Sequence, residues 1–297
     1  MKKIHPNTFP FNKRKALLGS TLAVSALFLL PGHGIAQTAN LSNGGSAMTV
    51  DLTGNDGVNS WTVDTSPVNQ LDSEWFYYSI NGGAAQPINS LGLVPGSDTV
   101  TGGNVLSATY NNGSISVQIG FTLSGSGSGS GQAALTANLL TVTSTSDLTS
   151  LNVYEYANFN LLQSYDNGIS ISPSYTAPPP FGTLLGYNGI QQTSGSTALS
   201  ETIGSPLAEF AEAGTTTQIL NDITAGGNLT GPVSVTATPD TDVAWGLEWS
   251  YQGIAANQME TVLQNQTLSI ATVPEPSSIA MIALGLGACG FLRRRQS

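Results

Sequence analysis

Basic side chains are almost absent from this sequence of 297 residues, and the few present lie at its two ends. Residues 37–273 contain no Lys, Arg, His or Cys, yet they hold 17 of the 18 acidic residues. The formal net charge of -10 therefore averages two cationic ends and a purely acidic middle. The basic residues are Lys2, Lys3, Lys13, Arg14, Lys15, Arg293, Arg294 and Arg295, and the histidines and the single cysteine are His5, His33 and Cys289.

These absences exclude several classes of function for the middle of the chain. Nucleic-acid binding needs Lys or Arg to neutralise phosphates, and a phosphate-cradling Walker loop needs its Lys. Ser-His-Asp and Cys-His catalysis need an imidazole, and Schiff-base chemistry needs an amine. Zinc, copper and iron sites built from His or Cys are excluded, as is a disulfide, so only oxygen ligands for hard cations remain.

The N-terminal segment, residues 1–36, is typical of a secretory signal peptide. A basic stretch precedes an apolar run at 16–30, and Gly34 and Ala36 place small residues at the −3 and −1 positions before Gln37. Signal peptidase is therefore expected to cut between Ala36 and Gln37. The alternative is a retained membrane anchor, which an apolar run of about 15 residues is too short to favour.

The C-terminal segment has three parts in a fixed order. Pro274, Glu275 and Pro276 form a stiff polar hinge, residues 277–292 form a Gly/Ala/Leu-rich apolar stretch, and Arg293, Arg294 and Arg295 follow it. As a helix the apolar stretch would be about 24 Å long, slightly less than a hydrocarbon core of about 30 Å. A short helix with Arg at one end can still span, with the arginines on the cytoplasmic side.

This arrangement resembles the PEP-CTERM sorting signal of Gram-negative bacteria. The resemblance covers roughly the last 25 residues and implies recognition by an exosortase, a membrane transpeptidase-like protease, with processing near Pro274–Pro276. Many members of that family accompany exopolysaccharide and biofilm genes. The resemblance implies a precursor held in the inner membrane by residues 274–297 and a product at the cell surface or outside it. The alternative is a plain tail anchor.

The central segment, residues 37–273, is predicted to be an all-β domain, a jelly-roll or Ig-like β-sandwich with at most one or two short helices. Alternation of period two is frequent, most clearly at 115–123, and Asn111–Gly113 is a hairpin signal before it. The Ser-Gly segment 124–131 is expected to be a long hairpin loop. Further strands are predicted at 75–80, 105–110, 133–143, 151–161, 233–238, 243–251 and 267–273.

One short helix is predicted at 206–213. Ser205 suits the N-cap, Pro206 the first helical position, Glu209 the first turn and Gly214 the C′ position.

A stiff proline run, Ala177–Pro180, is a candidate domain boundary. Neither flank looks self-sufficient, so a single sandwich is favoured over two domains.

Glycoside hydrolysis is the one enzyme class compatible with the available side chains, because two carboxylates can serve as acid and as nucleophile or base. The candidates are Glu155, between two tyrosines, and Glu248, beside Trp249. The competing interpretation is structural: on a strand with one buried and one exposed face, a Glu between core aromatic residues points to solvent. No spaced catalytic motif accompanies either residue, so the protein is expected not to be an enzyme.

Two further groups are candidates for binding. Trp245, Trp249 and Tyr251 share one face of one predicted strand, where they form either a carbohydrate platform or part of the core. Calcium is the ion that best fits the charge balance, and the candidate ligands are Asp51, Asp56, Asp240 and Asp242. Neither spacing matches an EF-hand loop, and Asp240 can equally be a turn residue.

The sequence thus predicts an exported surface or matrix protein with a structural or adhesive role near exopolysaccharide. The rival is a carbohydrate-binding or carbohydrate-active protein that uses Glu155 and Glu248. The expected partners are signal peptidase, an exosortase-like protease and exopolysaccharide, and not nucleic acid.

Overall fold

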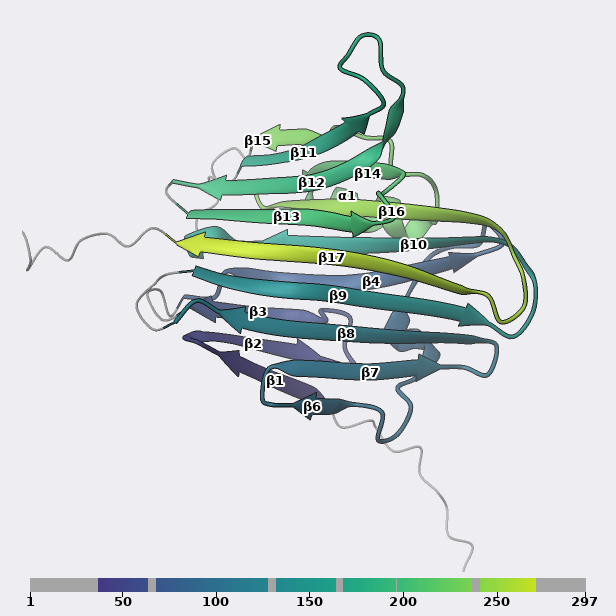
Figure 1. Cartoon of the computed structure of the whole chain (residues 1–297), viewed down its shortest axis with the longest axis horizontal. Helices are drawn as coiled ribbons and strands as arrows, with labels where there is room; N and C mark the ends of the chain where they lie inside the picture. Colours follow the sequence, from purple (N-terminus) through teal and green to yellow (C-terminus); the bar gives the residue numbers. More distant parts are fainter. Residues whose placement is uncertain are drawn as a thin grey trace, which may run out of the picture. The chain divides into compact units, whose positions relative to one another are not determined.

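The computed structural model describes residues 37–63, 68–127, 132–163, 168–195, 197–236 and 241–270. The predicted signal peptide and the predicted C-terminal apolar helix lie outside these residues. The described part is mostly β-structure, arranged as two antiparallel sheets with one α-helix (Figure 1). The all-β prediction is therefore confirmed, while the jelly-roll or Ig-like type stays a prediction.

The first sheet has eight strands in the order β1-β2-β3-β4-β10-β16-β14, and β5 pairs with β4 outside this path. Its strands are β1 (Thr38–Asn43), β2 (Ser46–Asp51), β3 (Val58–Val63), β4 (Leu71–Ile80), β5 (Gln86–Pro87), β10 (Leu148–Phe159), β14 (Phe210–Thr215) and β16 (Val243–Ile254).

The second sheet has nine strands in the order β15-β11-β12-β13-β17-β9-β8-β7-β6. Its strands are β6 (Thr99–Thr101), β7 (Val105–Asn111), β8 (Ile115–Gly125), β9 (Gln132–Ser144), β11 (Gly168–Tyr175), β12 (Leu184–Ser194), β13 (Thr197–Ser205), β15 (Ser234–Thr236) and β17 (Met259–Ile270). Short 3₁₀ turns η1 (Ile88–Leu91) and η2 (Leu161–Gln163) connect elements.

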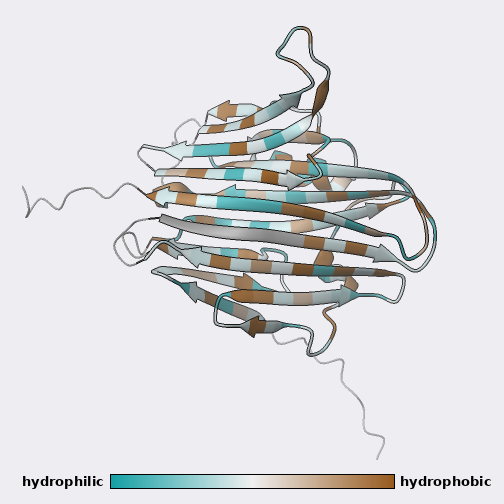
Figure 2. Cartoon of the chain, viewed as in Figure 1, coloured by the Kyte–Doolittle hydropathy of each residue, from teal (hydrophilic) through white to brown (hydrophobic). Residues whose placement is uncertain are grey.

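The two sheets pack face to face around one hydrophobic interior. Apolar and polar residues alternate along most strands (Figure 2), so each sheet has an apolar inner face. The predicted inner face of β8 is fully buried, as the alternation at 115–123 indicated. Hydrogen bonds also join the sheets: Gln192 Nε2 donates to the Phe159 carbonyl at 2.6 Å, and Tyr110 OH donates to the Leu52 carbonyl at 2.9 Å.

The local hairpin predictions are confirmed. Strands β7 and β8 pair directly across the turn at Asn111–Gly113, and β8 pairs with β9 across the Ser-Gly segment. The predicted strand at 75–80 corresponds to the second half of β4, and that at 267–273 to only the end of β17. Residues 128–131 of the Ser-Gly segment lie outside the described part.

The predicted helix at 206–213 is wrong. Residues 210–215 form β14, which pairs with β16, and the helix α1 follows at Thr216–Ala225. Thr215 is its N-cap and accepts a hydrogen bond from the Gln218 amide, and Gly226 closes it with a left-handed φ of 75°. The strand forms because its alternating Ala residues pack against β16, which overrides the capping pattern at Ser205 and Gly214.

Helix α1 covers the outer face of the first sheet. Its buried residues Ile219 and Ile223 lie over Gly246 of β16, where a Cβ atom would come within 3.2 Å of both side chains. Gly246 therefore permits the close approach of the helix to the strand. As a consequence β16 is buried on both faces from Val243 to Trp249.

The proline run Ala177–Pro180 is the loop of the hairpin formed by β11 and β12. Each of the two sheets contains strands from before this run and strands from after it. In Figure 1 the hairpin projects beyond the neighbouring strands.

Within the residues that the structure describes, helix α1 is short, and no helix has the length and apolar character needed to cross a bilayer. The predicted membrane-spanning stretch at 277–292 is not among them.

Candidate functional site

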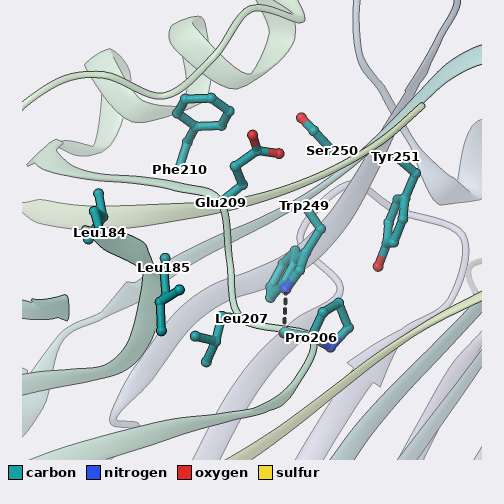
Figure 3. Close-up of a pocket in the computed structure, with 10 residues that line it drawn as sticks. Leu184, Leu185, Pro206, Leu207, Glu209, Phe210, Trp249, Ser250 and Tyr251 are labelled. Atoms are coloured by element: carbon teal, nitrogen blue, oxygen red, sulfur yellow. Dashed lines mark hydrogen bonds between the residues drawn. The ribbon is translucent and has the colours of Figure 1, made fainter. Parts of the chain in front are cut away.

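A cleft of about 500 Å³ opens beside the β11–β12 hairpin. Three segments form its walls: the start of β12, the connection that precedes β14, and the middle of β16 (Figure 3). The lining residues are Leu184, Leu185, Gly186, Pro206, Leu207, Glu209, Phe210, Trp249, Ser250 and Tyr251. In Figure 3 the leucines lie on one side of Trp249, Tyr251 lies on the other, and Glu209 and Phe210 lie above.

The cleft exists because β14 is shorter than its neighbour. Strand β14 pairs with β16 only from Val243 to Glu248, so among the described strands none pairs with the next residues, Trp249 to Tyr251, on that side. The chain before β14 crosses to the other sheet, where Ala208 bridges to Tyr187. This crossing leaves an open corner between the two sheets.

Trp249 supports the corner from inside. Its side chain is 1% exposed, and its indole Nε1 donates to the Pro206 carbonyl at 3.0 Å. This bond holds the 206–209 connection against the end of β16. Tyr251 is half-buried, while Leu185 and Glu209 are exposed, so the walls accessible from outside are aliphatic, aromatic and acidic.

Glu248 lies behind the cleft, on the outer face of the first sheet. Its Oε2 accepts from the Leu229 amide at 2.9 Å, and its Oε1 accepts from Asn152 Nδ2 and Ser250 Oγ, each at 3.1 Å. Burial raises the pKa of Glu248, the hydrogen bonds from Leu229 and Ser250 oppose the rise, and the carboxylate of Glu209 adds to it. Glu248 therefore ties the 226–232 segment to the sheet.

Glu155 lies on the opposite face, inside the sandwich. It is directly opposite Leu247 in the register of β10 and β16, whereas Tyr154 is opposite Glu248. Neighbouring positions on a strand point to opposite faces, so the two glutamates are separated by the sheet. The structure does not bring Glu155 and Glu248 together as a catalytic pair, which would have to flank one glycosidic bond.

The interior around Glu155 is acidic and amide-rich. Gln264 Nε2 donates to the Glu155 carboxylate, and Gln266 Nε2 donates to Glu201 Oε2 at 3.1 Å. Burial raises the pKa of Glu155 well above its ordinary value, and the nearby carboxyls of Glu201 and Glu74 raise it further. Burial also raises the pKa of Glu201 to about 7.

The aromatic residues proposed as a carbohydrate platform are divided by the fold. Trp245 is fully buried and stacks on Phe159 with ring centroids 5.3 Å apart, and Trp249 is also in the core. Neither presents an open ring face to a sugar. Tyr251 alone of the three lines the cleft with a partly exposed ring.

The candidate calcium ligands are spread over the sheet. Asp51 Oδ1 accepts from the backbone amides of Thr53 and Gly54 in a tight turn, and Asp242 Oδ2 accepts from Asn158 Nδ2 at 2.9 Å. Asp56 is exposed, and Asp240 lies outside the described residues. In the described ranges no group of three or more His, Cys, Asp or Glu side chains is arranged to hold a metal ion. Calcium binding stays a prediction.

The sequence pattern identified a residue of one wall of the cleft but none of the residues of the other two walls as part of a site. The pattern of β16 indicated Tyr251, but nothing local connects it to Leu185 or Glu209. Both positions depend on the crossing of 206–209 and on the pairing of β11 with β12. The one available signal was the apolar character of the segment around the proline run, from Tyr175 to Leu185.

The predicted processing sites lie at or beyond the limits of the described part. Gln37 is its first residue and bonds to Thr53 and Leu52 through its backbone, while Ala36 precedes it. The candidate sorting residues Pro274, Glu275, Pro276 and Arg293–Arg295 follow its last residue, Ile270.

Two solved structures show a limited likeness to this chain. A bacterial glucoamylase complexed with acarbose matches 85% of this chain and 36% of its own, with 8% sequence identity and a TM-score of 0.48. A copper-containing benzylamine oxidase from Hansenula polymorpha matches 77% and 59%, with 7% identity and a TM-score of 0.46. The chain thus spans less than two thirds of either protein. No curated protein matches it.

The family comparison concerns the C-terminus. Residues 272–296 match the model of the PEP-CTERM protein-sorting motif, which confirms the resemblance seen in the sequence. This motif indicates an exported protein that an exosortase, a membrane enzyme, processes. The chain therefore carries a PEP-CTERM sorting signal behind an acidic β-domain.

Proposed function

We propose that this protein acts at the cell surface as a non-catalytic adhesive component of an exopolysaccharide layer. The observation that carries the proposal is the apolar tip of the β11–β12 hairpin. Four of the nine large hydrophobic side chains that are exposed in the described residues belong to this hairpin: Tyr175, Phe181, Leu184 and Leu185. Phe181 is 91% exposed. Exposed apolar groups gathered on one projecting loop are typical of an interaction site.

The position of the hairpin supports an outward-facing role. Ile270, the last described residue, is opposite Thr197, which in turn is opposite Ser194 at the far end of β12. The hairpin tip lies beyond Leu184, at the other end of β12, roughly 33 Å away at the usual rise per residue. The sorting signal follows Ile270, so the chain leaves the domain at the end away from the hairpin (Figure 1).

Charge favours a polysaccharide over a second copy of the chain as the partner. The described domain carries carboxylates and no basic side chain, so two copies repel one another. A neutral or cationic polymer meets no such repulsion, and sugars offer apolar ring faces to Phe, Tyr and Leu. The separation of Glu155 from Glu248 by the sheet argues against the rival proposal, hydrolysis by that pair.

Retention in the extracellular matrix tests the adhesive role. The double variant Tyr175→Ser/Phe181→Ser should be exported normally but recovered mainly in the culture medium. Val100→Ser is the matched control, because Val100 is 44% exposed on β6 at the opposite edge of the second sheet. Retention of the double variant at the wild-type level would contradict the proposal.

Mass spectrometry of the cell-surface form tests the processing. We expect a chain that begins at Gln37 and ends near Pro274–Pro276. A surface form that still carries Arg293–Arg295 would instead indicate a simple anchor.

A further inference from the structure

The cleft combines apolar walls with a local excess of negative charge. Glu209 is exposed at the rim of the cleft, and its negative charge raises the pKa of Glu248, which lies behind the cleft wall. On the other side of the cleft, the negative charge of Glu260 contributes to the raised pKa of Tyr251. Since residues 37–273 contain no Lys, Arg or His, no side chain of this domain can neutralise these carboxylates. The negative potential is therefore available to a ligand.

The walls limit the kind of cation that fits. Leu185 and Leu207 lie across the cleft from Tyr251, whose ring is partly exposed, and Phe210 lies beside Glu209 (Figure 3). A small hydrated metal ion gains nothing from such walls. An organic amine on a ring does, because its carbon face packs on Leu and aromatic side chains while its ammonium group pairs with a carboxylate.

The strand edge supplies polar partners for such a ligand. Beyond Glu248, β16 has no neighbour on the cleft side, so the backbone groups of this edge face the opening. Sugar hydroxyls can bond to backbone N–H and C=O groups of this kind. A volume of about 500 Å³ is sufficient for one or two sugar rings.

We infer that this cleft binds an amine-bearing sugar unit, such as a deacetylated hexosamine of a matrix polysaccharide, with Glu209 pairing with the ammonium group. The inference rests on the proposed adhesive function and adds the class of sugar that is recognised. It distinguishes the cleft from the hairpin tip, which contacts the polymer through apolar groups alone.

The test compares oligosaccharides that differ only at the amine. Binding of a glucosamine hexamer, its N-acetylated counterpart and cellohexaose to the exported protein is measured by calorimetry at low ionic strength and slightly acidic pH. We expect the glucosamine hexamer to bind at least about fivefold more tightly than the other two, and salt to weaken this binding.

Variants locate the binding in the cleft. Glu209→Gln, which keeps the size of an exposed side chain, should lower the affinity for the glucosamine hexamer about fivefold, and Glu209→Lys should abolish it. Asp98→Asn removes the same charge beside β6, at the opposite edge of the second sheet, and should leave the affinity unchanged. Circular dichroism establishes that each variant is folded.

Three results would overturn the inference: equal affinity for the free and acetylated hexamers, no effect of Glu209→Gln, or an equal loss in Asp98→Asn. These results leave the adhesive function standing as long as Tyr175→Ser/Phe181→Ser still releases the protein from the matrix. If that double variant is retained while Glu209→Gln weakens glucosamine binding, the adhesive proposal fails and the cleft assignment survives.

Discussion

Glu155 of β10 and Glu201 of β13 bring their carboxyl groups together in the interior, although they belong to different sheets. Both side chains are fully buried, and each accepts a hydrogen bond from a glutamine of β17. Because residues 37–273 contain no basic side chain to pair with these carboxyl groups, burial of the two charges favours binding of a proton. The folded protein therefore holds protons on this pair at pH values at which the unfolded chain has already lost them.

The first prediction concerns pH. Because burial raises the pKa of Glu201 to about 7, and that of Glu155 also rises, the folded state holds more protons than the unfolded state above about pH 4.5. The contribution of this pair to the free energy of unfolding should be fully present at and below about pH 4.5 and should be lost as the pH rises to 7 and beyond. We expect a loss on the order of 2 kcal/mol from this pair, measured by urea unfolding.

The variant Glu201→Gln tests whether this buried pair causes the fall in stability with rising pH. The amide keeps the shape and an acceptor for Gln266 but carries no charge, so the variant should be more stable than the wild type at pH 8 and less dependent on pH. Asp56→Asn, at an exposed position, should keep the wild-type slope. A stability that is flat between pH 5 and 8 in the wild type would contradict the argument.

The second prediction separates a structural from a catalytic role for Glu248. Glu248→Ala leaves the buried Leu229 amide without its acceptor and removes one of the two acceptors of Asn152 Nδ2, so it should cost about 2–3 kcal/mol of stability. Ser250→Ala removes only one partly exposed donor and should cost less than about 1 kcal/mol. A stable Glu248→Ala protein would show that the carboxylate does not hold the 226–232 segment.

The faces of strands could be derived from the sequence, but what covers each face could not. Alternation in β16 correctly placed Trp245 and Trp249 on one side and Glu248 on the other. It suggested solvent on the side of Glu248, whereas helix α1 and the segment around Leu229 cover that side. Covering elements come from distant parts of the chain, so a local pattern carries no information about them.

The third prediction concerns the helix that the sequence placed ten residues too early. Thr215→Ala should cost about 1 kcal/mol, because the Thr215 hydroxyl accepts from the Gln218 amide at 3.3 Å and caps α1. Ser205→Ala should cost less than about 0.5 kcal/mol, because Ser205 ends β13 and caps nothing. Equal effects in thermal unfolding would contradict the observed start of the helix.

This error shows which signals were decisive. Ser205 and Thr215 are both suitable N-cap residues, and a glycine follows each segment, Gly214 in the first and Gly226 in the second. Capping signals alone therefore do not decide which of the two segments is the helix. The burial of Ile219 and Ile223 with Asn221 exposed between them does, since all three side chains would lie on one face of a strand but not of a helix. The turn at Asn111–Gly113 was found because its partners are adjacent in sequence, whereas the pairing of β10 with β4 and β16 spans long separations.

The fourth prediction uses two tyrosines of the same sheet. Tyr251 OH is buried and has no hydrogen-bond partner among the described residues, so Tyr251→Phe should raise the stability by about 1 kcal/mol. Tyr154 OH accepts from Asn152 Nδ2 at 3.1 Å and donates to the Gly227 carbonyl at 3.4 Å, so Tyr154→Phe should lower it by about 1 kcal/mol. Opposite signs in urea unfolding are expected, and a loss in both variants would contradict the assignment for Tyr251.

The fifth prediction follows from the separation of charges along the chain. Trypsin requires Lys or Arg, and none lies between Gln37 and Val273, so the processed protein should stay uncut even in denaturant. A glutamate-specific protease should behave differently. It should cut the folded protein first at exposed Glu209 and should reach buried Glu155 and Glu201 only after unfolding. Mass spectrometry of the fragments distinguishes these sites, and early cleavage at Glu155 or Glu201 would contradict their place in the core.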